Sequence, residues 1–182
     1  MTSLTGMGME ARISEVRWCG DVEASLGELH RQMLEPEALA ALLPDAGTLE
    51  MMAKGLLQML QHLPPEFVGD GTSDTLRQAI AEIESNGVPS SREQVMVVMT
   101  EALGTGSALD IDGVSETEVT EALIATPLPS EQSRDLFGSD APSVEQVRAV
   151  TNWQMESRSA HYVVCTDATG PTHVVFAGLS GD

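Results

Sequence analysis

Apolar residues recur at helical spacing over most of this chain, and that periodicity predicts a fold dominated by helices. Val22, Leu26, Leu29 and Met33 are spaced so that all four lie on one face of a helix. Asp21 directly precedes them and offers the side chain that typically caps a helix N-terminus. Similar stripes predict six further helices, over residues 36–43, 48–63, 74–85, 91–103, 115–125 and 143–153.

The segment 48–63 carries the broadest of these stripes. Aromatic residues make up only 3% of the chain, so its core has to be built from aliphatic side chains and from the ten methionines. A helix that is apolar over so much of its circumference is typically buried. We therefore expect this helix to lie at the centre of the core, through Leu49, Met51, Met52, Leu56, Leu57, Met59, Leu60 and Leu63.

The sequence pattern changes near the C-terminus. Residues 160–166 and 172–178 are rich in β-branched and aromatic residues and flank a turn-forming run, which predicts a β-hairpin. Both strands are apolar on both faces, and an isolated hairpin is barely stable in water. The hairpin therefore needs either a third strand with a covering helix or a partner chain. Residues 9–18 fit a helix, which we favour, but they also fit that third strand.

These patterns together predict an α+β protein that is mostly α. We expect a helical bundle-like core with a C-terminal helix and a β-hairpin. Residues 1–125 should form an acidic helical domain, and residues 143–182 the C-terminal helix plus hairpin, packed on that domain. Residues 126–142 are rich in proline and serine, so we interpret them as a linker or long loop.

The formal net charge of −19 restricts the partners of this 182-residue chain. Such a field repels phosphate backbones and anionic lipid surfaces, which argues against direct binding of nucleic acid or membrane. A basic protein is its natural complement, although acidity can also serve solubility alone. The first residues lack a basic start followed by an apolar run, so we expect a cytoplasmic location without a signal peptide.

The acidic residues are concentrated in one stretch, and that stretch is the first candidate for a binding surface. Residues 93–133 hold eight acids and no base. A solvated face is the plain interpretation, and a docking face for a basic protein is the alternative. The apolar hairpin supplies a second candidate surface. The resulting candidate partner-binding residues are Glu93, Glu101, Asp110, Asp112, Glu116, Glu118, Glu121, Val163, Val175 and Phe176.

Two constellations resemble chemical sites but depart from them. Asp110 and the acids that follow it partly match a calcium loop, yet Val114 and Ser115 stand where the loop needs an oxygen ligand and a glycine. The predicted hairpin also carries the thiol, imidazole and carboxylate groups of a cysteine hydrolase, in Cys165, His161, His173 and Asp167. A loop at residues 168–171 would, however, place His173 on the opposite strand face from Cys165. We therefore expect no metal, no cofactor and no catalytic residues.

The sequence favours a non-enzymatic, acidic protein-binding factor. Such a factor could be an assembly cofactor, a chaperone-like escort or a small subunit of a larger complex, and a homodimer is a further expectation. One alternative is an inhibitor or immunity-type protein that blocks a basic site. Another alternative is a small enzyme that depends on Cys165.

Overall fold

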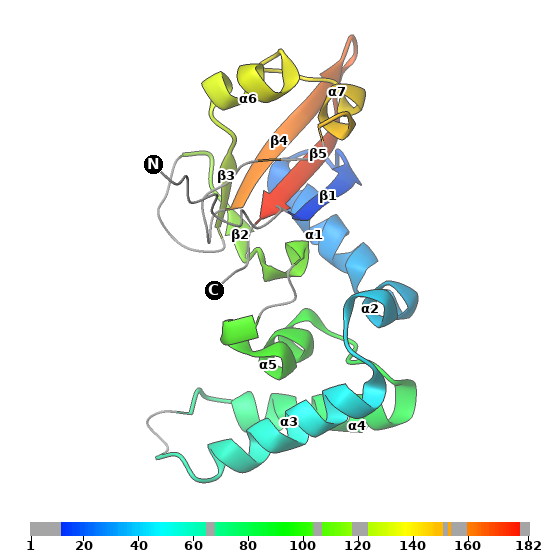
Figure 1. The fold of residues 1–182 in the computed structure, drawn as a ribbon, viewed down its shortest axis with the longest axis vertical. Helices are drawn as coiled ribbons and strands as arrows, with labels where there is room; N and C mark the ends of the chain where they lie inside the picture. Colours follow the sequence, from blue (N-terminus) through cyan, green and yellow to red (C-terminus); the bar gives the residue numbers. More distant parts are fainter. Residues whose placement is uncertain are drawn as a thin grey trace, which may run out of the picture. The chain divides into compact units, whose positions relative to one another are not determined.

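The computed structural model describes residues 12–64, 68–103, 107–117, 124–150, 153 and 160–178. The chain divides into two compact units (Figure 1). We call them the sheet unit, comprising Met1–Leu29 and Gly106–Asp182, and the helical unit, comprising His30–Thr105. Each unit is described by itself below.

The sheet unit is built on five strands in the order β1-β5-β4-β3-β2. β1, β5 and β4 are antiparallel neighbours, whereas β3 and β2 continue the sheet in parallel. The chain is thus α+β, but the predicted helical core with an appended hairpin is wrong, because the hairpin forms the middle of a mixed sheet. The strands are β1 (Arg12–Arg17), β2 (Gly113–Val114), β3 (Ile124–Pro127), β4 (Ala160–Asp167) and β5 (Gly170–Gly178).

β1 corrects the helix that we favoured for residues 9–18. All six of its residues pair with β5, from Arg12 opposite Gly178 to Arg17 opposite His173. A short segment that fits both periodicities takes the structure that satisfies its neighbours, and β5 has an open edge that needs a strand. The third strand that the apolar hairpin required is therefore supplied by this chain.

β3 corrects the end of the helix predicted over residues 115–125. Ile124 and Ala125 are extended and pair with Gly113 and Val114, while residues 118–123 lie outside the described part of the chain. β3 and β4 are parallel neighbours, so the chain between them has to cross over one face of the sheet. The predicted linker region, residues 126–142, contains the end of β3 and α6 (Ser130–Phe137), and α7 (Val144–Arg148) follows it.

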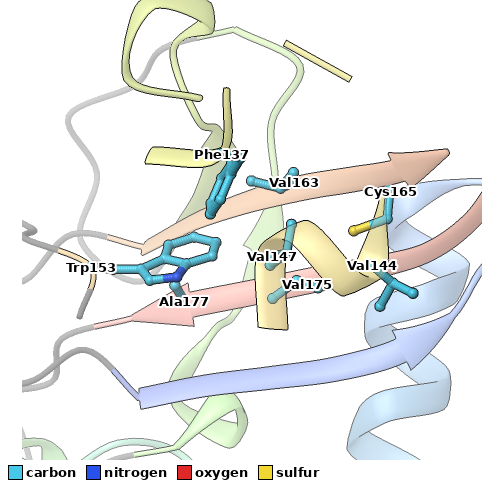
Figure 2. Close-up of a cluster of buried hydrophobic side chains, with 8 residues drawn as sticks. All are labelled: Phe137, Val144, Val147, Trp153, Val163, Cys165, Val175 and Ala177. Carbon is cyan, nitrogen blue, oxygen red and sulfur yellow. The ribbon is translucent and has the colours of Figure 1, made fainter. Parts of the chain in front are cut away.

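The crossover covers one face of the sheet with an apolar cluster (Figure 2). The rings of Phe137 and Trp153 face each other with centroids 5.2 Å apart. Figure 2 shows Val144 and Val147 of α7 over the valines of β4 and β5. The predicted Ser143–Gln146 capping box starts α7, but this helix ends at Arg148, well before Trp153.

The opposite face of the same strands is also covered. Phe176 and Val174 of β5 are buried there, and the rings of Phe176 and Tyr162 lie 6.3 Å apart. The short 3-10 helix η2 (Ala108–Asp110) contacts both β1 and β5. Both faces of the hairpin are therefore satisfied within the described chain, as its apolar composition requires.

In the described part of the helical unit, α3, α4 and α5 pack against one another. Asp45 caps α3 by accepting a hydrogen bond from the Thr48 amide, and Gly87 ends α4 in the left-handed conformation. Among the described residues, no helix has the length and apolar character needed to cross a membrane. The helices are α2 (Pro36–Leu42), α3 (Ala46–Leu60), α4 (Thr72–Asn86) and α5 (Arg92–Leu103), preceded by α1 (Val22–Met33), in which the boundary between the units falls.

A bidentate ion pair ties α7 to the edge strand β1. Arg148 donates two hydrogen bonds to Glu15, from Nε to Oε2 at 2.8 Å and from a terminal nitrogen to Oε1 at 2.6 Å. The hydrogen bonds from Arg148, helped by its charge and by His173, hold the pKa of Glu15 below its ordinary value of 4.5. The side chain of Glu15 is 28% exposed, so this pair is shielded more than a typical surface pair.

Replacing Arg148 by Gln should lower the free energy of unfolding of the sheet unit at pH 7, because Glu15 loses both hydrogen bonds of this pair. Because the folded-state pKa of Glu15 is depressed, the contribution is complete above pH 4.5 and is lost as the pH falls through the folded-state value. Urea unfolding followed by tryptophan fluorescence measures this effect, since both tryptophans, Trp18 and Trp153, belong to the sheet unit.

The matched control is Arg134→Gln, which breaks a single-contact pair with Asp140 whose side chains are 61% and 53% exposed. We expect a smaller loss there. Equal losses for the two variants, or a loss in Arg148→Gln that does not diminish as the pH falls below the folded-state pKa of Glu15, would contradict the assignment.

Candidate functional site

The predicted acidic residues are distributed over both units of the chain. Glu93 lies exposed in the first turn of α5 and accepts a hydrogen bond from Thr75, and Glu101 lies later in the same helix. Both belong to the helical unit, whereas Asp110, Asp112 and Glu116 belong to the sheet unit. Glu118 and Glu121 lie outside the described residues.

Asp110 has a structural role. It is 4% exposed and completes a capping box for η2, in which its carboxylate accepts a hydrogen bond from the Ser107 amide. Gly113 and Val114 then form β2, so the segment that partly matched a calcium loop is extended here. Of the three acids in residues 107–117, Asp112 and Glu116 are exposed. Among the described residues, no group of three metal-binding side chains is assembled.

The three apolar candidates lie in the interior of the sheet unit. Val163 and Val175 are cross-strand partners beneath α7, and Phe176 points to the opposite face. All three are at most 5% exposed. Their apolar character is explained by packing within this chain.

The strand register differs from the one expected at Cys165. The hairpin loop is only Ala168–Thr169, and a bulge lies between Cys165 and Thr166. Cys165 is consequently opposite His173, on the same face, whereas we predicted opposite faces. Glu15, which lies 3.8 Å from Nε2 of His173, completes a set of thiol, imidazole and carboxylate.

This set lacks the properties of a cysteine nucleophile. Cys165 is fully buried under α7, and its burial, followed by the nearby charges of Glu15 and Glu145, raises the pKa of its thiol to about 11. A nucleophilic cysteine needs the opposite, a thiolate that is accessible at neutral pH. Nδ1 of His173 is buried without a hydrogen-bond partner in the described part of the chain, so it does not hold the thiol proton. Cys165 therefore packs as an apolar residue.

α3 presents the clearest candidate binding surface, and it corrects our expectation for residues 48–63. Only Leu49 and Ala53 of this helix are buried. Met51 is 68% exposed, Met59 is 54% exposed and Leu63, just past the helix end, is 39% exposed. We call these three residues the α3 stripe. The sequence showed that the apolar face of this helix is broad. It could not show which part of that face α4 and α5 leave exposed.

The α3 stripe has a regular geometry. Met51 and Met59 lie on a row of positions spaced four apart, which turns round the helix by about 40° at each step. Gly55 stands exposed between them and adds no side chain. From Met51 to Met59 this row extends over roughly 12 Å at the helical rise of about 1.5 Å per residue. That length corresponds to about two turns of another helix.

One edge of the α3 stripe carries an ionic cluster. Lys54, the only lysine of the chain, forms ion pairs with Glu50 and, at 2.8 Å, with Glu84 of α4. The hydrogen bonds to Glu50 and then to Glu84 raise the pKa of Lys54 to about 12. Two carboxylates share one ammonium group, so this edge keeps a net negative charge.

The chain has no significant match among protein-family models, curated proteins or solved structures.

Truncating Phe176 to Ala should lower the free energy of unfolding by about 3–5 kcal/mol, because it removes a buried ring and leaves a cavity. Urea unfolding followed by tryptophan fluorescence gives the value. Ile13→Ala is the control, since Ile13 is a large apolar residue of the same sheet that is 39% exposed. A loss below about 1 kcal/mol for Phe176→Ala would contradict the internal packing described here.

The two cysteines should differ sharply in reactivity. Cys19 is exposed and Cys165 is buried, so alkylation of the native protein by iodoacetamide at pH 8 should modify Cys19 within minutes and leave Cys165 intact. In urea, Cys165 should react as well. Mass spectrometry of the peptides locates the label, and rapid labelling of Cys165 in the native state would revive a catalytic role.

Proposed function

We propose that this chain is a non-enzymatic protein-binding factor that docks its partner on the α3 stripe. The observation that carries the proposal is the exposure of Met51 and Met59 on one helix and of Leu63 just past its end. Isolated apolar side chains are ordinary on protein surfaces, whereas several gathered at one element are typical of an interaction site. Assembly cofactor, escort and small subunit are three forms of this same function.

The residue types of the stripe suit a binding role. Burying a methionine or leucine side chain contributes about 1.5–3 kcal/mol, so the stripe offers several kcal/mol before the costs of association are deducted. Methionine is unbranched and flexible, so it adapts to partner surfaces of different shape. This adaptability fits a factor that accompanies or assembles other chains.

The overall charge supports a basic partner. The net charge of −19 attracts a positively charged protein over long distances and speeds its association. The apolar stripe would then supply the short-range contact. This division between steering and contact is common at interfaces with charged rims.

The alternatives from the sequence have less support. A cysteine enzyme needs a reactive thiolate, and burial suppresses it at Cys165. An inhibitor of a basic site needs exposed acids, and Glu93, Asp112 and Glu116 are the candidate acids that are exposed in the described part of the chain.

The double substitution Met51→Gln with Met59→Gln tests the proposal. It removes apolar surface without changing charge, and both positions are exposed, so the fold should persist. The wild-type chain and the double variant are each immobilised on a resin and incubated with an extract of the source cells. We expect the wild type to retain a partner protein, and the double variant to retain about tenfold less of it. Quantitative mass spectrometry of the retained proteins gives the ratio.

Ile13→Gln is the matched control, because it makes the same type of change at an exposed apolar residue of the sheet unit. It should retain the partner as well as the wild type does. Circular dichroism of all three proteins checks that they are folded. Identical sets of retained proteins for the wild type and the double variant would argue that the α3 stripe binds nothing.

A further inference from the structure

The α3 stripe includes a row of the kind along which two helices pack. Met51, Gly55 and Met59 occupy successive positions four residues apart, and such rows fit into the grooves of a second helix. An extended peptide would instead need a free sheet edge, and α3 offers none because its backbone groups are bonded within the helix. The geometry of the stripe therefore points to a helical occupant.

The charges of the helical unit indicate which charge the partner helix should carry. The helical unit contains eleven acidic and four basic residues, which gives it a formal net charge of −7. Three of the four bases form ion pairs with carboxylates of the same unit: Arg31 with Glu35, Lys54 with Glu50 and Glu84, and Arg77 with Asp74. Their positive charges are thus already compensated.

The edge of the stripe next to Met51 also carries more acidic than basic groups. Lys54 lies three residues after Met51, so the two are neighbours on the helix surface. The ammonium of Lys54 is shared by Glu50 and Glu84, and the second carboxylate is left without a cation of its own. A lysine or arginine at the border of the partner's apolar face would compensate it.

A second copy of the chain fits this surface poorly. Two helical units meeting through α3 would bring together two net charges of −7, and like charges at an interface oppose association. Resting on the proposed function, we infer that the occupant of the α3 stripe is a basic amphipathic helix. Its apolar face covers Met51, Met59 and Leu63, and its cations face the Glu50–Lys54–Glu84 cluster.

A pair of synthetic peptides tests this inference directly. One is an 18-residue amphipathic helix of leucine and lysine (about five turns), and the other has glutamate at every lysine position. Fluorescence anisotropy of the labelled peptides against the full chain should show the lysine peptide binding at least about tenfold more tightly than the glutamate peptide. Met51→Gln with Met59→Gln should weaken binding of the lysine peptide at least about tenfold, and Ile13→Gln should leave it unchanged.

The charge of the cluster is tested by Glu84→Gln, which keeps the Lys54–Glu50 pair and removes the extra carboxylate. It should weaken binding of the lysine peptide about threefold and reduce its salt dependence. Asp135→Asn, the same change of charge at an exposed residue of α6, is the matched control and should have a smaller effect.

Four results would overturn the inference: no binding of the lysine peptide, equal affinity for the two peptides, wild-type affinity in the methionine variant, or a dimer in light scattering that the methionine variant abolishes. The first three reject a basic helix seated on the stripe, and the fourth identifies a second copy as its occupant. The proposed function fails separately, when the extract experiment finds no partner that depends on the stripe.

Discussion

The sheet unit depends on the pairing of β5 with a strand on each side. Val174, Val175, Phe176 and Ala177 are buried one after another, so this strand is apolar on both faces. A strand of that composition is stable only when two strands flank it and both faces are covered. β1 and β4 provide the flanks, α7 covers one face, and η2 contacts the strand from the chain segment that precedes β2. The ion pair between Glu15 and Arg148 then joins an edge strand to the covering helix.

The parts of this fold that the sequence predicted are those that short-range chemistry determines. Asp21 hydrogen-bonds the Ala24 amide at the start of α1, and the Ser143–Gln146 box starts α7 as its spacing indicates. The hairpin of β4 and β5 was also visible, because β-branched residues flank a turn. In each case the residues that form the structure are neighbours in the sequence.

The sheet itself was missed because its other pairings join distant segments. β1 pairs with a strand more than 150 residues later, and its six residues fit a helix as well as a strand. β3 has only four residues, too few for a periodicity to be recognised. The face of His173 was predicted wrongly for a related reason, since a single bulge beside Cys165 reverses which residues share a face. Bulges depend on local pairing geometry that composition does not encode.

The candidate site illustrates a different limit of sequence reasoning. The apolar width of α3 was evident, and burial is the usual consequence of such width. Burial, however, requires something to cover the helix, and the contacts with α4 and α5 leave Met51 and Met59 exposed. The sheet unit has satisfied its apolar strands with its own helices, whereas the helical unit retains an uncovered apolar surface. An apolar surface that the chain does not cover itself lowers its free energy when another molecule covers it. That difference is why we place the function on α3 and not on the hairpin, although the hairpin is the more apolar of the two in sequence.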